Sequence, residues 1–448
     1  MFFEDPALEA EGLAQARYKA ETLARAFSDL GLVAWAPGSN DWAAGEEELT
    51  KLTKLARAQP LAANLKGSAW QASKIIRRGD LTLGLVGISL PERLGSPSSL
   101  AFADERTALS EAVQKLNERG VKLVVLMLAA QRGQALRLLE GLAPGTVQVA
   151  IVGKSFDQGE SNDPPINPEL LGETLVVQAP NHLQGLAVID LHVSPGDWTF
   201  ADGSGLEQKA QLGRLRAQIA ELQARVKKWQ QKKTISQADL QVQIERLQGL
   251  QAELSRLQKS TTSQIPQGSY YVYEQVEVRE AQGADAAVAK RLAAYYKTVN
   301  DHNRLAFSDR VPRAVSDGQA SYVGIEVCSS CHQEERAVWQ ATGHAHAYET
   351  LSSQHKEYNL DCVSCHVTGY EKPGGSTVTH VEKLTDVQCE VCHGPGSLHV
   401  TSPLSDSLIE AHPSPSLCAS ACHHSPHVGD DWNVAEALPK ILGPGHGR

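Results

Sequence analysis

The chain has 448 residues, of which 42% are hydrophobic, and a formal net charge of −10. Because this length exceeds one ordinary hydrophobic core, we expect two or more domains. The acidic balance argues against a general nucleic-acid-binding protein, and the lack of any run of about 18 apolar residues argues against a membrane span.

Residues 1 to about 200 alternate between amphipathic helical segments and short apolar runs, which indicates a sheet covered by helices. A hairpin is expected within this region over residues 74–89, with its turn at Gly79–Asp80. The expected helices are residues 13–31, 43–58, 104–120 and 133–142, and the expected strands are residues 32–38, 60–65, 122–129, 147–153, 174–180 and 185–193.

Residues 206–260 carry two apolar seams with alternating spacings of three and four, typical of a coiled coil. A polar link separates the seams, and Ser236 within it is a plausible N-cap of the second helix. We predict an antiparallel helical hairpin, either a spacer that packs on itself or an arm that pairs with a second copy. The seam residues are Leu212, Leu215, Ile219, Leu222, Val226, Trp229, Leu240, Ile244, Leu247, Leu254 and Leu257.

The chain is expected to return to the α/β region with a strand at residues 268–278 and a helix at residues 284–305. The predicted domains are therefore an α/β domain (1–203 and 266–305), a helical hairpin (204–262), a linker (306–321) and a last domain (322–448). The last domain, mainly helical or irregular, is rich in His, Cys, Gly, Ser and Pro and too poor in apolar runs to supply its own core.

Four short segments of the last domain place two cysteines ahead of a histidine and use every cysteine of the chain. Three read Cys-x-x-Cys-His (CSSCH, CVSCH and CEVCH), and the fourth, CASACH, has one more residue between its cysteines. We number them the first to the fourth motif in chain order. The cysteines are Cys328, Cys331, Cys362, Cys365, Cys389, Cys392, Cys418 and Cys422, and the histidines that follow them are His332, His366, His393 and His423.

Cys-x-x-Cys-His is the attachment signature of c-type haem. Both sulfurs add to the porphyrin vinyl groups, and the adjacent imidazole ligates the iron. Zinc ribbons also use Cys-x-x-Cys pairs, but zinc does not need a histidine directly after each pair. We therefore predict four covalently bound haem c groups, the fourth on the less common spacing, and these macrocycles would supply the missing core.

Composition also limits the second axial ligand of each iron. The only methionines, Met1 and Met127, lie far from the motifs, which disfavours His/Met ligation. Thirteen of the sixteen histidines follow residue 320, so histidine is the remaining ligand type. Iron ligated by two histidines suits electron transfer better than ligand chemistry.

The segments CSSCHQEERAVWQATGHAHA, DCVSCHVTGY and VQCEVCHGPG resemble the tetrahaem cytochromes c that accept electrons from hydroxylamine oxidoreductase. The resemblance covers roughly residues 322–446. It implies that His344 ligates a different haem from that of the first motif and that His399 is another distal ligand. His380, His427 and His446 are further candidates, and one haem of the family is five-coordinate.

The order of elements in residues 14–195 and 268–278 resembles the metallophosphoesterase domain of periplasmic 5′-nucleotidases. The metal-binding residues of that family are replaced: Gly38, Ser39, Asn40 and Asp41 stand for Gly-Asn-His-Asp, Ala129 and Ala130 for Ser-His, and Gly153, Lys154, Ser155 and Phe156 for Gly-His-Ser-His. Two-metal hydrolysis needs clustered carboxylates and imidazoles. A degenerate α/β phosphoesterase domain without activity is therefore expected, although Asp41 is retained.

The sequence thus predicts an exported, periplasmic or extracellular, multihaem cytochrome that transfers electrons. Its first residues resemble no signal segment and an opening strand is missing, so we expect the natural start to lie upstream of Met1. The expected partners are redox proteins such as other cytochromes, with peripheral attachment or anchoring at a membrane left open. Three alternatives remain: an active phosphoesterase with an appended cytochrome, a haem enzyme with one open iron site, and a subunit of a cytochrome filament.

Overall fold

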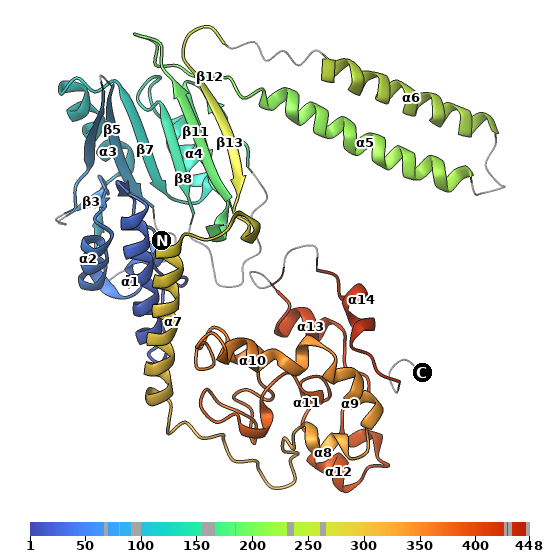
Figure 1. The fold of residues 1–448 in the computed structure, drawn as a ribbon. Coiled ribbons are helices and arrows are strands. Elements are labelled where there is room, and N and C mark those ends of the chain that lie inside the picture. Colours follow the sequence, from blue (N-terminus) through green and yellow to red (C-terminus); the bar gives the residue numbers. More distant parts are fainter. Residues whose placement is uncertain are drawn as a thin grey trace.

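The computed structural model describes the chain except for residues 67–69, 80, 91–99, 155–165, 184, 231–236, 260–265, 425–427, 429–431 and 445–448. It comprises an N-terminal α/β region, a pair of long helices and a C-terminal region of short helices and loops (Figure 1). In the described part of the chain, no helix is both long and apolar enough to cross a membrane.

A six-stranded sheet forms the centre of the α/β region, with strand order β4-β5-β7-β8-β10-β9. The four middle strands are parallel, and the edge strands β4 and β9 run antiparallel to their neighbours. Helices α3 and α4 cover one face, where their apolar side chains pack on those of β5, β7 and β8. The elements are β4 (Ser73–Arg78), β5 (Leu81–Ser89), α3 (Glu105–Glu118), β7 (Leu123–Ala129), α4 (Arg132–Glu140), β8 (Val149–Gly153), β9 (Glu169–Leu171) and β10 (Thr174–Gln178).

A three-stranded sheet with the order β11-β13-β12 packs on the other face of the six-stranded sheet (Figure 1). Tyr271 and Tyr273 of β13 and Phe200 are buried between the sheets against Leu123, Val149 and Leu175. The strands are β11 (Gly185–His192), β12 (Ala201–Asp202) and β13 (Tyr270–Glu277), and two shorter pairs are formed by β1 (Ala34–Trp35) with β2 (Gln59–Pro60) and by β3 (Leu65–Lys66) with β6 (Ala101–Phe102).

A separate apolar cluster is formed mainly by α1 (Leu13–Asp29), α2 (Gly45–Ala56) and residues near the N-terminus, including Phe2, Trp35 and Trp42. Helix α7 (Ala286–Ala306) lies beside α1 and leads from the α/β region to the C-terminal region (Figure 1). Three short 3-10 helices, η1 (Ser39–Trp42), η2 (Asn181–Leu183) and η3 (Glu280–Gln282), occupy the connections.

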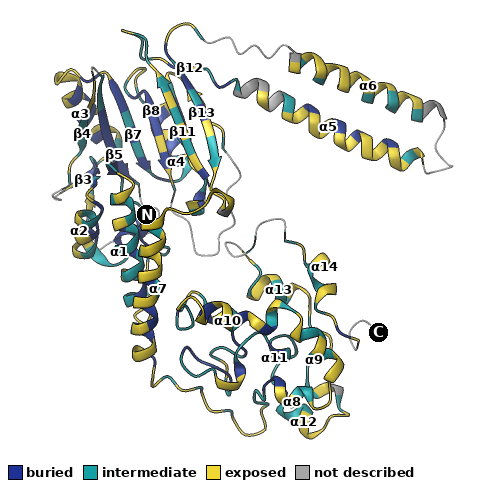
Figure 2. Ribbon diagram, viewed as in Figure 1, coloured by how far each residue is buried: buried dark blue, intermediate teal, exposed yellow. Residues whose placement is uncertain are grey.

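Helices α5 (Leu206–Gln230) and α6 (Gln237–Lys259) leave the three-stranded sheet and lie side by side (Figure 1). Most of their surface is exposed, whereas strands β5, β7 and β8 of the six-stranded sheet are largely buried (Figure 2). Four predicted seam residues of α5 are buried, while those of α6 are partly exposed. Ser236 lies outside the described residues. The buried residues are Leu215, Ile219, Leu222 and Val226.

The C-terminal region consists of short helices joined by long connections. Among the described residues, its largest apolar cluster contains four buried side chains, those of Phe307, Val363, Val367 and Val378. The elements are α8 (Ile325–Ser329), α9 (Gln333–Gln340), η4 (Gly343–His346), α10 (Ala347–Ser352), η5 (Val363–Cys365), η6 (Glu382–Leu384), α11 (Cys389–His393), α12 (Ser397–Thr401), η7 (Asp406–Leu408), α13 (Ser416–Ala421), α14 (Val434–Ala437) and η8 (Leu438–Lys440).

The structure confirms the expected α/β pattern, including the hairpin, in which Arg78 pairs with Leu81. The expectation of full strands at residues 32–38 and 60–65 was wrong, because only Ala34, Trp35, Pro60 and Leu65 of these residues belong to strands. Pro37 has no N–H to donate to a neighbouring strand, and the 3-10 helix η1 begins two residues later.

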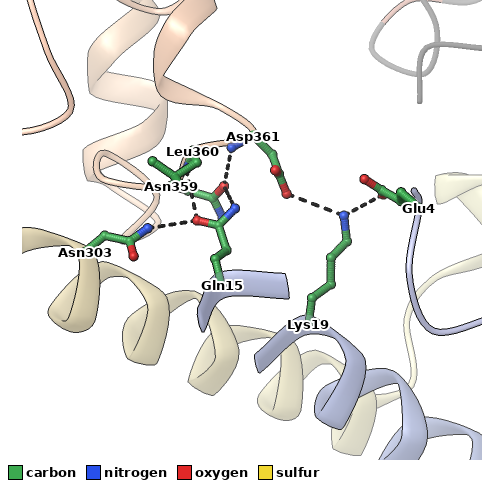
Figure 3. A network of polar contacts seen from close by, with 7 residues as sticks. All are labelled: Glu4, Gln15, Lys19, Asn303, Asn359, Leu360 and Asp361. Carbon is green, nitrogen blue, oxygen red and sulfur yellow. Dashed lines mark hydrogen bonds and ion pairs between the residues drawn. The ribbon is translucent and has the colours of Figure 1, made fainter. Parts of the chain in front are cut away.

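Buried amide side chains connect the α/β region to the C-terminal region (Figure 3). Gln15 of α1 donates to Asn359 Oδ1 at 3.1 Å and accepts from Asn303 Nδ2 at 2.8 Å and from the Leu360 backbone N–H at 3.0 Å. The side chains of Gln15, Asn303 and Asn359 are 4%, 1% and 2% exposed. Because buried polar groups are stable only when paired, this network favours one relative placement of the two regions.

Replacing Gln15 with leucine is expected to destabilise the protein. The change removes the acceptor of the Leu360 N–H and of one Asn303 Nδ2 hydrogen, and each buried group left unpaired costs about 1–3 kcal/mol. Urea unfolding of the full chain measures the loss. Gln114→Leu is the control, because the Gln114 amide donates only to Glu118 on an exposed surface. Equal unfolding midpoints for the two variants would contradict the role of the network.

Candidate haem-binding site

Each of the four motifs lies on or beside a short helical turn. The first spans the end of α8 and the start of α9, the second lies on η5, the third forms α11, and the fourth begins in α13. On a helix, residues three and four apart share a face. In the third motif, which lies within one helix, this rule places Cys389, Cys392 and His393 on one face, as covalent attachment of a porphyrin followed by iron ligation requires.

None of the eight cysteines, all of which belong to the described residues, forms a disulfide. Thiols from different motifs instead lie next to one another. Cys328 of the first motif shares a hydrogen bond with Cys389 of the third, and Cys422 of the fourth shares one with Cys365 of the second. The Cys365 thiol also lies 3.5 Å from the backbone oxygen of Ala421 in the fourth motif.

The third and fourth motifs meet as well. Burial and the nearby Cys418 thiol raise the pKa of Cys392, which belongs to the third motif. The hydrogen bond from Cys422 lowers the pKa of Cys365, and the same contact together with burial raises the pKa of Cys422. The cysteines that influence one another thus place the motifs next to one another in the order first, third, fourth, second.

Two motif histidines each lie opposite another histidine, and the two ring separations are similar. The ring centroids of His332 and His399 are 6.4 Å apart, and those of His344 and His423 are 6.0 Å apart. Two imidazoles that ligate one metal ion at about 2 Å from opposite sides have centroids separated by about 6 Å. The spacing of both pairs therefore fits an iron ion ligated by two histidines.

The chemistry of these histidines also suits ligation. The Nδ1 atom of His399 is buried without a hydrogen-bond partner, which leaves a polar atom for a ligand to satisfy. Burial and the neighbouring His423 lower the pKa of His344, which favours the neutral imidazole that binds metals. The residues present therefore fit the haem that the motifs imply.

Backbone carbonyl groups orient two further motif histidines. His366 Nδ1 lies 2.6 Å from the carbonyl oxygen of Ala347, and His393 Nδ1 lies 2.6 Å from that of Glu410. A metal-ligating histidine usually donates its second ring N–H to such an acceptor, which fixes the tautomer and the ring plane. Both rings are thereby set to present Nε2 as the ligand atom.

The other predicted ligands are placed differently. His380 Nδ1 lies 3.1 Å from the hydroxyl of Thr379, and no ring contact joins this side chain to a motif histidine among the described residues. His427 and His446 lie outside the described residues.

Glu390, the residue after the first cysteine of the third motif, is a structural element that the sequence did not reveal. Its buried carboxylate accepts hydrogen bonds from the backbone N–H groups of Val323 (2.9 Å), Gly324 (2.8 Å) and Gly396 (2.7 Å). The side-chain oxygen of Gln388 accepts from the Ile325 N–H at 2.6 Å, at the start of α8. The third motif therefore holds the helix that carries the first motif. The only sign of this role in the sequence is an acidic residue between the two cysteines of the motif.

The first of the positions that we compared with phosphoesterase metal ligands are buried in this chain. Ser39, Asn40 and Asp41 are all buried, and the Asp41 carboxylate accepts from the backbone N–H groups of Gly38 and Phe2, both at 2.9 Å. Ala129 is the last residue of β7 and Ala130 follows it. Ser155 and Phe156 are not among the described residues. Within the described ranges, no group of three or more His, Cys, Asp or Glu side chains is arranged to hold a metal ion.

The Glu390→Ala substitution is expected to lower the free energy of unfolding by about 3 kcal/mol or more, since it leaves three backbone donors without their charged acceptor. Glu349→Ala removes a carboxylate whose side chain is 80% exposed and serves as the control. Denaturant unfolding followed by circular dichroism compares the two. An effect of Glu390→Ala no larger than that of Glu349→Ala would refute the proposed structural role.

Comparison with known proteins bears on both regions. Residues 327–394 match the family model described as Cytochrome c554 and c-prime. Cytochrome c-554 of Nitrosomonas europaea is 38% identical over 93 residues, which cover 17% of this chain and 40% of that protein. The chain therefore spans well under half of this relative.

Solved structures of phosphoesterases are also similar to the chain. A 5′-nucleotidase precursor from Thermus thermophilus is 23% identical, covers 41% of this chain over 38% of its own and has a TM-score of 0.34. A sulfate thiohydrolase SoxB from the same organism is 22% identical, covers 42% over 34% of its own and has a TM-score of 0.35. No activity follows from these values. The sequence of residues 327–394, which includes the first three motifs, is thus similar to the cytochrome c554 family.

Proposed function

We propose that the protein is an exported electron-transfer protein that holds haem c covalently at all four motifs. The observation that carries the proposal is that cysteines of different motifs lie near one another in a single series, which runs from the first motif through the third and fourth to the second. The similarity of residues 327–394 to cytochrome c554 supports it independently.

In this proposal the chain supplies both cofactor attachment and iron ligation. The cysteine pairs form the thioether bonds, and His332, His366, His393 and His423 are the proximal ligands. His399 is the distal ligand at the first motif and His344 the distal ligand at the fourth, as their ring separations suggest. His380, His427 and His446 remain the candidates for the second and third motifs.

The thiol contacts set the distance between neighbouring redox groups. A haem at each motif supplies a one-electron carrier whose iron alternates between the ferric and ferrous states. Since cysteines of consecutive motifs lie near one another, the chain would bring consecutive carriers close together. Imidazole on both sides of iron closes its coordination and favours electron transfer over substrate binding.

The remainder of the chain is proposed to act as a scaffold. The α/β region (1–203 and 266–305) carries no described metal cluster, and the linker (306–321) joins it to the haem region (322–448). The helical hairpin (204–262) is proposed to be a coiled coil that packs on itself, because the buried seam of α5 is the face that α6 covers. The net charge of −10 favours a redox partner with a basic surface.

Intact mass of full-length protein produced with the haem-maturation machinery tests the proposal. We expect a mass increment of four haems, and of three when Cys389 and Cys392 are both replaced by alanine. A protein with the mass of the bare polypeptide, or with zinc in place of haem, would overturn the proposed function.

Replacing His399 with alanine is expected to convert one of the haems from low spin to high spin, because the substitution opens one axial position. His412→Ala is the matched control, since this histidine is exposed and is assigned no ligand role. Electron paramagnetic resonance of the oxidised proteins distinguishes the two. An unchanged spectrum in His399→Ala would exclude this residue as a ligand, and a wild-type haem that binds cyanide would favour the haem-enzyme alternative.

A further inference from the structure

The second motif is in direct contact with the α/β region. Asp361 immediately precedes Cys362, and its Oδ2 lies 3.4 Å from Lys19 Nζ on α1 (Figure 3). The same ammonium group lies 2.6 Å from Glu4 Oε1. An ion pair thus crosses from the N-terminal helix to the residue beside a haem-attachment cysteine.

The backbone at this contact is held from several sides. The Asp361 N–H donates to Asn359 Oδ1 at 2.9 Å, and the preceding Leu360 N–H donates to Gln15. On α7, the Asn300 side chain accepts from the Tyr358 backbone N–H at 3.1 Å, and the Asn303 side chain donates to the backbone oxygen of Tyr358 at 2.8 Å. Helices α1 and α7 therefore fix the segment that leads into the second motif. They thereby also fix the position of Asp361 and Cys362 relative to Lys19 on α1.

The charges at this contact act on the cysteine itself. Burial and the Asp361 carboxylate raise the pKa of Cys362 to about 11, while the ammonium groups of Lys356 and Lys19 act in the opposite direction. Burial lowers the pKa of Lys19, but Asp361 and Glu4 hold it above its ordinary value, so the side chain is charged at neutral pH. Both members of the ion pair consequently contribute to the potential at the second motif.

We propose that Lys19 and Asp361 are positioning residues of opposite sign that set the reduction potential of the haem at the second motif, which makes the α/β region an electrostatic part of that redox centre. The inference rests on the proposed function, because it requires haem at Cys362 and Cys365. It assigns the α/β region a role beyond that of a scaffold.

The direction of each effect follows from electrostatics. Reduction adds one electron to the iron, so a nearby negative charge disfavours reduction and a nearby positive charge favours it. Loss of the Lys19 ammonium therefore lowers the potential, and loss of the Asp361 carboxylate raises it. The two side chains are 33% and 39% exposed, so solvent and salt screen the effect. We expect a threefold to tenfold change in the reduction equilibrium, the upper value being about 59 mV for one electron.

Potentiometric titration of the haem-loaded full chain, with dithionite as reductant, tests the proposal. Lys19→Met is expected to lower one of the four midpoint potentials and Asp361→Asn to raise one, with the other three unchanged and both shifts smaller at high salt. Lys51→Met is the matched control, because Lys51 forms an ion pair with Glu21 within the α/β region. Its midpoint potentials should equal those of the wild type.

Shifts of the midpoint potential in opposite directions distinguish electrostatic control from a structural effect of breaking the ion pair. Both Lys19→Met and Asp361→Asn break the ion pair, so a purely structural role predicts shifts in the same direction. Shifts of the same sign, no shift in either variant, or an equal shift in Lys51→Met would overturn the inference. Protein without haem shows no iron titration at all, and that result would instead overturn the proposed function.

Discussion

Cysteines of different motifs lie near one another at three places in the C-terminal region, where the chain provides little apolar packing of its own. The largest apolar cluster among the described residues there has four buried side chains. The motifs are instead held by polar groups such as the Glu390 carboxylate, which ties the first motif to the third. A region built in this way is suited to enclosing large apolar cofactors, which would complete a core that the chain itself does not provide.

The N-terminal region reaches the haem region through buried amides rather than through an apolar interface. Gln15, Asn303 and Asn359 satisfy one another and the backbone of the second motif segment. Such a network is costly when it is incomplete, so it specifies orientation more strictly than apolar packing does. A fixed orientation matters here because the Lys19–Asp361 ion pair, at 3.4 Å, depends on it.

Local patterns in the sequence predicted most of the α/β elements, since hydrophobic periodicity reflects which face of a helix or strand is buried. The motifs could also be recognised, because the spacing of Cys and His is a local property. The order of the motifs in space could not, since it arises from contacts such as Cys365 with Cys422, distant along the chain. Gln15 and Asn359 are separated by 344 residues, and neither is unusual in its local sequence. We expected His344 and His399 to be ligands from the resemblance to multihaem cytochromes. The structure shows which motif histidines lie opposite them.

The most direct measurement of the central claim is the location of iron in crystals of the haem-loaded protein by anomalous scattering at the iron edge. The account predicts four iron positions, each beside one motif, with neighbours in the order first, third, fourth, second. Iron positions in any other order, or a signal at the zinc edge from the cysteine pairs, would contradict it.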